Sequence, residues 1–244
     1  MYTLKDKNYF EQLNNSNPEI CNHVKALFES TKEDIRIGCH DIVNAVSLIH
    51  GYAQLYASAN PEITNNSKWK DVTDSIQYLI KLMSDISTYR YSDVLTLSPG
   101  SIDSTIRKII SDYSGKSSLM IDLAIPDSLP DIVFNADAVK YIIHSLLDNI
   151  SDINPAAQVD ITANFDTDHI YITVSDSLGG LSDEIMSKLF QPFLNGKEFH
   201  SGLSLATSYR MMMAHNGSLS YKPSDSGGSS FVLTFKTQNS HQTF

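Results

Sequence analysis

A histidine, the aspartate that follows it and an asparagine four positions on form the first group of residues whose types and spacing suit chemistry. They are His40, Asp41 and Asn44. Residues four apart share one face of a helix, so in a helix the asparagine lies beside the imidazole ring. An imidazole nitrogen is a nucleophile near neutral pH, and an adjacent carboxylate orients the ring and fixes its tautomer. The group suits a nucleophilic histidine at position 40, but a lone histidine on a helix surface is usually only solvated, which is how we interpret His50 and His144; what sets His40 apart is the sequence around it.

The stretch around His40 has the pattern of a helix in a bundle. Apolar residues recur at alternating intervals of four and three over residues 35–56 and again over residues 69–86, with Pro61 between the two series. The pattern predicts an antiparallel helical hairpin whose first helix begins at about residue 33. One hairpin is too small to cover its own apolar seams, so we expect two copies to pair as a dimeric four-helix bundle. The alternative is that the hairpin packs against the C-terminal half of its own chain.

The composition narrows the classes of function. The chain has 244 residues, with 18 Lys plus Arg against 28 Asp plus Glu and a net charge of −10. This acidity disfavours binding to a nucleic acid or an anionic membrane, because both need a basic surface. Two cysteines are too few for a disulfide framework, no apolar run is long enough to cross a membrane, and residues 1–22 lack a signal-peptide core. We therefore expect a soluble, cytoplasmic protein with no nucleic-acid and no membrane partner.

A second pattern begins near residues 98–100, where we place the boundary between two domains. The helical domain covers residues 1–97, a mixed domain covers residues 98–238, and residues 239–244 form a tail. Helices are predicted at residues 101–113, 137–153, 182–190 and 203–215. Strands are predicted at residues 119–125, 159–165, 170–174, 218–221 and 231–235. The predicted fold class is α+β, a helical hairpin followed by an α/β sandwich with a largely antiparallel sheet.

Short motifs in both halves resemble those of sensor histidine kinases and occur in the same order. The run from His40 to Asn44 (His-Asp-Ile-Val-Asn) resembles the phosphoacceptor box, and residues 146–150 (Leu-Leu-Asp-Asn-Ile) resemble the N box. Residues 174–181 (Val-Ser-Asp-Ser-Leu-Gly-Gly-Leu), 190–193 (Phe-Gln-Pro-Phe) and 202–206 (Gly-Leu-Ser-Leu-Ala) resemble boxes of the family's nucleotide pocket. The resemblance covers most of the chain, and it implies a phosphoacceptor bundle followed by a domain of the histidine-kinase ATPase type.

The resemblance assigns roles to residues of both halves. It implies that His40 accepts a phosphoryl group, with Asp41 as its orienting acid–base group and Asn44 close to the phosphoryl oxygens. Five residues of the second half match positions that bind the nucleotide in the family. They are Asn149, Asp176, Gly180, Lys197 and Gly202. Asn149 is the implied ligand of Mg²⁺, and Asp176 is the implied acceptor of the adenine amino group.

Three glycines of the family's nucleotide pocket are replaced here, by Leu178, His200 and Ser204. A side chain at such a position restricts the backbone and blocks the close approach of N–H groups to phosphate. We therefore interpret the chain as a phosphorelay histidine phosphotransferase, in which His40 carries a phosphoryl group between aspartates of response-regulator receiver domains. Mg²⁺ would then come mainly from the partner regulator, and ATP binding would be impaired. Two alternatives stay open: a histidine kinase that phosphorylates His40 from Mg-ATP, and a non-catalytic protein that binds a kinase or a regulator.

Overall fold

The chain divides into two compact units, residues Met1–Ser87 and Thr88–Phe244. The computed structural model describes residues 12, 14–115, 117–126, 128–194, 200–224 and 227–237. The sequence pattern places the boundary after residue 97, but the two units divide after Ser87. The boundary is earlier because residues that follow Ser87 make hydrogen bonds within the second unit. In the part of the chain that is described, no helix is long and apolar enough to cross a membrane.

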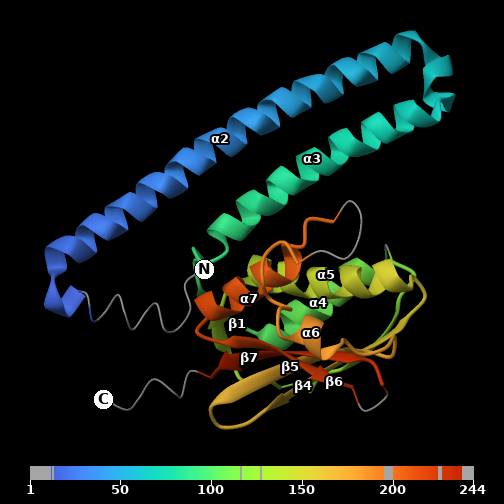
Figure 1. Cartoon of the computed structure of the whole chain (residues 1–244). Helices are drawn as coiled ribbons and strands as arrows, with labels where there is room; N and C mark the ends of the chain where they lie inside the picture. Colours follow the sequence, from blue (N-terminus) through green and yellow to red (C-terminus); the bar gives the residue numbers. More distant parts are fainter. Residues whose placement is uncertain are drawn as a thin grey trace. The chain divides into compact units, whose positions relative to one another are not determined.

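The first unit is a hairpin of two long helices (Figure 1). α2 spans Pro18–Ala59, α3 spans Ser67–Tyr91, and the 3₁₀ helix η1 spans Pro61–Asn65 between them. The side chain of Asn17 caps α2 by accepting a backbone N–H of its first turn, and the proline that opens η1 prevents α2 from continuing. The predicted hairpin is confirmed, but α2 begins well before residue 33. Asparagine followed by proline is a typical helix start, but Asn17 and Pro18 lie before the apolar series on which the prediction rests.

Much of the apolar seam of this hairpin is exposed in the single chain. Val46 and Ile76 are buried, and near the turn the ring of Tyr56 lies 5.9 Å from that of Trp69. Other seam side chains are about half exposed: Ile42, Ile49, Tyr56, Val72 and Leu79. Such surface is what a second hairpin would cover, so pairing of two copies remains a prediction.

The second unit is a five-stranded sheet with helices on one face (Figure 1). The strand order is β2-β4-β5-β7-β6, with β2 parallel to β4 and the other neighbours antiparallel. The strands are Met120–Ala124 (β2), Gln158–Phe165 (β4), His169–Asp176 (β5), Ser218–Pro223 (β6) and Ser229–Lys236 (β7). Burial alternates along β4 and β5, as it does in strands that turn one face to a core. The predicted strands and the largely antiparallel sheet are confirmed.

Three helices close the core of the second unit. α4 spans Ile102–Ser114, α5 spans Ala136–Ile153 and α7 spans Ser204–Ala214. The side chains of Ser101 and Asn135 cap α4 and α5 by accepting backbone N–H groups of the first turn. Apolar side chains of all three helices join those of the strands in one buried cluster. This packing fixes the rotation of each helix, and with it the direction in which its polar residues point.

Two features of the second unit differ from the sequence prediction. The helix predicted over residues 182–190 is a single turn, α6, Asp183–Met186; beyond it the backbone bonds join residues three apart, and Pro192 excludes a further helical turn. Residues 98–100, where the sequence pattern places the domain boundary, form the strand β1 (Ser98–Gly100), which pairs antiparallel with β3 (Ile132–Phe134). Strands of three residues are too short to show an alternating pattern.

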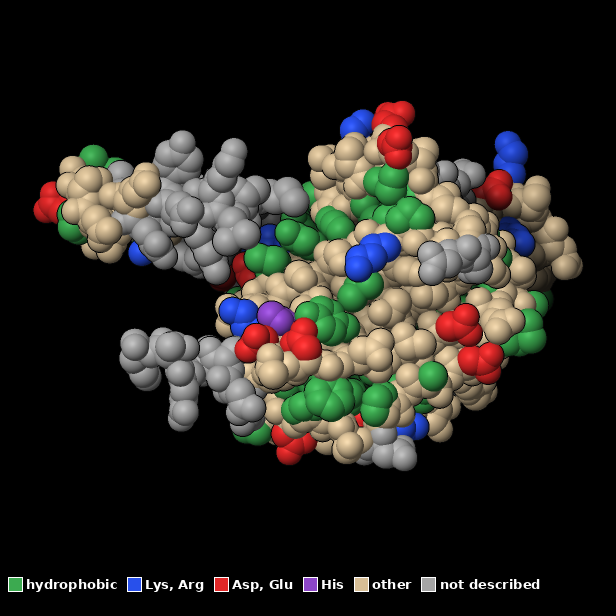
Figure 2. All heavy atoms as spheres, turned by 90° about the horizontal axis from the view of Figure 1, so that it is seen from below, with side chains coloured by type: hydrophobic (Ala, Val, Ile, Leu, Met, Phe, Trp, Pro, Cys, Tyr) green, Lys and Arg blue, Asp and Glu red, His purple; other side chains and the backbone are tan. Residues whose placement is uncertain are grey.

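The face of the sheet that the helices leave open has a mixed surface. Figure 2, seen from below Figure 1, shows acidic and basic side chains in small groups with apolar side chains between them. The β4–β5 turn is held by Asp166, whose Oδ1 accepts the N–H groups of Asp168 and His169 at 2.8 Å each. These backbone bonds lower the pKa of the Asp166 carboxyl.

Candidate functional site

His40 lies on α2 with most of its side chain in solvent. The side chain is 64% exposed. Its Nδ1 lies 3.4 Å from Oδ1 of Asp41 and 3.2 Å from Nδ2 of Asn44. The structure therefore brings the three residues of the predicted phosphoacceptor group together, and it leaves the ring open to a bulky phosphoryl donor.

The two contacts at Nδ1 require different tautomers of the ring. The carboxylate of Asp41 is an acceptor, so a bond to it needs a proton on Nδ1, whereas the amide N–H of Asn44 needs a lone pair there. With the proton on Nδ1, the lone pair that can attack is on Nε2. Asp41 thus favours Nε2 as the nucleophile, and in that tautomer the Asn44 amide is released to bind another group.

Asn149 lies half-buried on α5, at a place fixed by its neighbours. Leu147 and Ile150 are buried in the core. Asp148 is exposed, and its Oδ1 accepts a hydrogen bond of 2.7 Å from the hydroxyl of Tyr113 on α4. Burial, and then this bond to the carboxylate, raise the pKa of Tyr113, so the hydroxyl keeps its proton and ties α4 to α5. The position of the Asn149 amide is therefore fixed by the core packing of α5 and by the hydrogen bond between Asp148 and Tyr113.

Asp176 ends β5 and is only 8% exposed. Its Oδ1 accepts the backbone N–H of Leu178 at 2.8 Å, which turns the chain away from the strand. Within the described part of the chain its other oxygen, Oδ2, makes no hydrogen bond. Because a buried carboxylate needs donors, Oδ2 is a natural acceptor for the amino group of a ligand.

Glycines shape the backbone around Asp176. A Cβ on Gly228 would overlap the carbonyl oxygen of Asp176 and lie 2.5 Å from its carbonyl carbon. At Gly180 a Cβ would lie 3.4 Å from the hydroxyl of Tyr221, and that hydroxyl accepts the N–H of Leu181 at 2.9 Å. The loops after β5 and before β7 are thus packed backbone to backbone at Asp176.

Gly202 joins two of the predicted motifs. Its φ of +65° is in the left-handed region, and a Cβ there would lie 2.6 Å from the carbonyl oxygen of Leu194. Its own carbonyl accepts the N–H of Phe193 at 2.9 Å. The motifs at residues 190–193 and 202–206 are therefore neighbours. Lys197, between them in sequence, lies outside the described residues.

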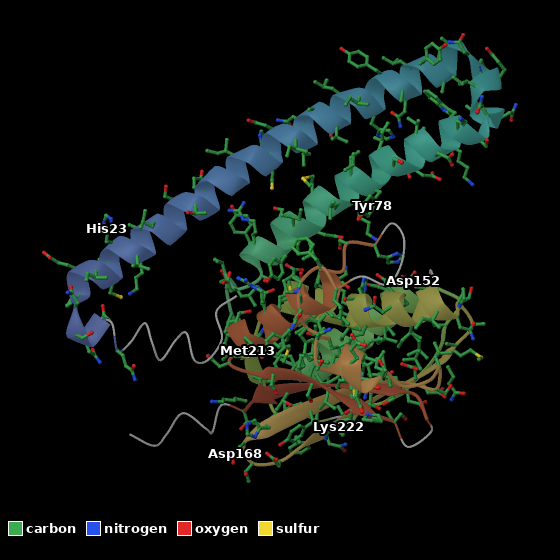
Figure 3. All side chains as sticks on the ribbon, in the orientation of Figure 1. His23, Tyr78, Asp152, Asp168, Met213 and Lys222 are labelled. Carbon is green, nitrogen blue, oxygen red and sulfur yellow. The ribbon has the colours of Figure 1, made fainter. Side chains whose placement is uncertain are left out.

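The structure locates the three residues that replace glycines of the family's nucleotide pocket. Leu178 packs against the core of the second unit. Nε2 of His200 lies 2.8 Å from Oδ2 of Asp152, which Figure 3 labels near the C-terminal end of α5. Ser204 is the first residue of α7. Sequence reasoning missed Asp152, although a carboxylate three positions after Asn149 on a predicted helix was a usable signal.

A cavity of about 810 Å³ lies between α4 and α5. Tyr113, Lys140, His144 and Asp148 are among the residues that line it, and the ring of Tyr113 stands edge-on to that of His144 at 5.1 Å. None of the predicted nucleotide-binding residues lines this cavity. The candidate site is therefore defined by the motif side chains and not by this hollow.

Comparison with known proteins gives matches to kinases and to one ATPase family. Residues 134–239 match the family described as "Histidine kinase-, DNA gyrase B-, and HSP90-like ATPase". The chain is 24% identical over 206 residues to sporulation kinase E of Bacillus subtilis (strain 168), over 80% of this chain and 27% of that protein. It is 23% identical over 199 residues to the sensor histidine kinase ZraS of Escherichia coli (strain K12), over 80% of this chain and 43% of that protein. The solved structure of full-length ShkA in complex with AMPPNP is similar with a TM-score of 0.69 at 19% identity, over 83% of this chain and 45% of that chain.

These matches correct the functional interpretation and confirm the fold. The chain spans less than half the length of the three proteins. The interpretation as a phosphotransferase that does not use ATP is wrong, because an ATPase family and histidine kinases are what the chain resembles. Leu178 and His200, two of the side chains on which that interpretation depended, are engaged with the core and with Asp152. Residues 134–239 match the histidine kinase-, DNA gyrase B- and HSP90-like ATPase family, and the fold of the chain has the layout of a histidine kinase core.

Proposed function

We propose that this chain is the core of a histidine kinase that transfers the γ-phosphoryl group of Mg-ATP to His40. The observation that carries the proposal is an exposed imidazole held at Nδ1 by Asp41, in a chain whose second unit contains a domain of an ATPase family. The similarity to sporulation kinase E and to ZraS supports it, and so does the fold shared with ShkA, whose solved structure contains AMPPNP.

The residues of the second unit fit a magnesium nucleotide. Oδ2 of Asp176, a residue that is only 8% exposed, is the acceptor for the adenine amino group, and Gly180 keeps the adjoining loop close to the base. The amide oxygen of Asn149 is a hard ligand that suits Mg²⁺, which takes its remaining ligands from phosphates and water. Among the described residues no cluster of three His, Cys, Asp or Glu could hold a metal ion, so binding together with a nucleotide is the fitting mode.

The phosphate end of the nucleotide needs backbone donors and positive charge. Gly202 lies two residues before Ser204, the first residue of α7, and the first N–H groups of this helix have no partner within it and attract phosphate oxygens. We assign the ammonium group of Lys197 to the same phosphates. When bound, Mg²⁺ would neutralise charge on the phosphate oxygens and favour the departure of ADP.

Transfer requires the Nδ1-protonated tautomer of His40. The Nε2 lone pair attacks the γ-phosphorus in line, a nitrogen–phosphorus bond forms, the bond from phosphorus to the β–γ bridging oxygen breaks, and ADP leaves. Positive charge develops on the ring, and the Asp41 carboxylate stabilises it at Nδ1 until that proton passes to water. Asn44, released from the ring in this tautomer, is placed to donate to a phosphoryl oxygen.

Two partners complete the proposal. The half-exposed apolar seam residues of the hairpin support pairing of two copies through this unit. The aspartate of a response-regulator receiver domain would then take the phosphoryl group from His40, with Mg²⁺ bound at the regulator.

The proposal is tested by incubating the purified chain with Mg²⁺ and ATP labelled at the γ-phosphate. We expect wild type to acquire acid-labile label and His40→Gln to acquire none. The matched control is His50→Gln on the same helix, whose ring contacts Gln54 at 3.4 Å and which should be labelled normally. Asn149→Ala should prevent labelling, and Asp176→Asn should weaken nucleotide binding. Label that persists in His40→Gln, or wild type that stays unlabelled at saturating Mg-ATP, refutes the assignment.

A further inference from the structure

Arg210, on α7, binds the chain segment at the end of α3 through three contacts. Its Nε donates to Oγ of Ser92 at 3.1 Å, its Nη2 lies 2.5 Å from Oδ2 of Asp93, and its guanidinium carbon lies 4.8 Å from the centre of the Tyr89 ring. Ser92 is 1% exposed, and the Arg210 side chain is 27% exposed. We name these four residues the junction clamp.

The junction clamp uses the whole guanidinium group. A rigid planar fork that donates to two oxygens while its face lies on an aromatic ring is a geometry that lysine cannot reproduce. Ser92 is also satisfied on its other side, because its hydroxyl donates to the carbonyl of Tyr89 at 2.7 Å. A second tie lies nearby, where Nδ2 of Asn135 donates to the carbonyl of Thr96 at 2.8 Å. The segment over residues 89–96 is therefore fixed to the second unit at two places.

α7 also contains the end of one motif that we assign to the nucleotide, residues 202–206, and it contacts another, residues 190–193. α7 begins directly after Gly202 and Leu203, and its eleven residues form one uninterrupted helix. Tyr209, next to Arg210, stacks on Phe190 of the motif at residues 190–193, with ring centres 5.0 Å apart and planes at 22°. One packed helix thus contacts both nucleotide-side motifs and the segment that continues α3.

We propose that Arg210 is a positioning residue for phosphoryl transfer, an inference that rests on the proposed kinase function. α3 is a continuous helix over Ser67–Tyr91, and its last turn belongs to the second unit. A hold on that turn limits the motion of the junction through which the hairpin and the ATPase-family domain are connected. Misplacement of reacting groups by about 1 Å can cost about a hundredfold in rate. The clamp contacts no predicted nucleotide ligand, so it acts on the rate of transfer and leaves nucleotide binding unchanged.

The first test compares Arg210→Ala with Arg107→Ala in the full chain. Arg107 is a matched control, because its guanidinium also makes an intramolecular bond in the second unit, to the carbonyl of Ile125 at 2.7 Å, but on α4 and apart from the clamp. Label incorporation is followed over a range of Mg-ATP concentrations. For Arg210→Ala we expect the limiting rate to fall about tenfold or more while KM and the Kd of AMPPNP change less than about twofold. Arg107→Ala should keep the wild-type rate.

A second measurement separates positioning from a general loss of structure. The Ser92→Ala, Asp93→Asn double variant should lose about as much rate as Arg210→Ala, and the combination of all three should lose no more, because they disable one contact set. Amide hydrogen exchange should rise at residues 89–96 in Arg210→Ala and stay unchanged at Asp176.

The outcomes separate the two proposals. Wild type that takes no label overturns the kinase assignment and this inference with it. If wild type is labelled and Arg210→Ala matches its rate, or loses it through KM alone, the kinase assignment survives and the positioning role does not. Equal rate losses in Arg107→Ala and Arg210→Ala would also overturn the positioning role.

Discussion

Replacement of Gly228 by alanine adds a single methyl group, yet it should weaken nucleotide binding at the proposed site and destabilise the fold. The added Cβ would overlap the carbonyl oxygen of Asp176, lie 2.5 Å from its carbonyl carbon and lie 2.7 Å from Cα of Ser177. Carbon atoms do not approach so closely, so the loop before β7 and the end of β5 must separate by about 0.5 Å or more. The clash is with backbone atoms on both sides, so no side-chain rotation relieves it.

The cost follows from the packing at this point. Overpacking of this kind costs about 2–3 kcal/mol of the free energy of unfolding, which corresponds to a fall in Tm of about 4–12 °C for a unit of this size. Asp176 moves with its backbone, so Oδ2 would lose the alignment with the adenine amino group that the proposed function assigns to it. A hydrogen bond to a charged group is worth about 1.5–3 kcal/mol, so the Kd for nucleotide should rise about 10- to 100-fold.

Calorimetric titration with AMPPNP at 25 °C, where the variant is still folded, measures the affinity, and thermal unfolding measures the stability. Gly217→Ala is the matched control. A Cβ there overlaps the carbonyl oxygen of Thr234, which lies four residues along β7 from Ser230, the partner of Ser175. It should destabilise the fold by a similar amount and leave the Kd unchanged. Equal losses of affinity in the two variants would refute the reasoning, because the effect would then follow stability and not the position of Asp176.

Three further predictions concern other parts of the chain. Asn44→Ala should slow labelling of His40 about tenfold in a γ-labelled ATP assay and leave the Tm within about 1 °C, since the side chain is exposed; a large fall in Tm would contradict its placement. His200→Gly should weaken AMPPNP binding about two- to fivefold, because it leaves the Asp152 carboxylate unpaired one turn from Asn149, and a gain in affinity would show that the imidazole obstructs the pocket. Burial lowers the pKa of His215 from its ordinary 6.5, so the unfolded chain binds a proton more readily. The free energy of unfolding should therefore fall below about pH 6.5, by up to about 1.4 kcal/mol per pH unit, a slope that denaturant titrations should show in wild type and not in His215→Gln.

The regular elements follow from the sequence because their side chains repeat. The alternation over residues 159–165 and 170–174 results directly from one buried face on each strand, and the seam over residues 35–56 repeats along one face of α2. The start of α2 at Pro18 and the strands β1 and β3 were missed for a physical reason: they are set by a cap and by pairing between strands of three residues, and neither leaves a periodic pattern. The dimer and the role of Lys197 stay predictions.

The candidate site divides in the same way between local and distant contacts. The group at His40 follows from spacing alone, because its partners lie one and four residues away on one helix. The contact of His200 with Asp152 joins residues 48 apart, and that of Arg210 with Asp93 joins residues 117 apart. No spacing rule reaches such distances, so a carboxylate near Asn149 and the junction clamp became visible only with the fold.

The wrong interpretation of the chain as a phosphotransferase that does not use ATP also arose because contacts between distant residues cannot be read from the sequence. Counting glycines along a motif treats every replacement as a side chain in the pocket, but a side chain obstructs a ligand only if its Cα–Cβ bond points toward the ligand. At Leu178 the side chain joins the core, and at His200 it reaches Asp152, so both side chains make contacts within the protein. At Gly228 a Cα–Cβ bond would point at the backbone of Asp176, which already occupies the position of the Cβ. For the nucleotide site that we propose, the contact between Gly228 and Asp176 therefore matters more than the number of glycines that remain.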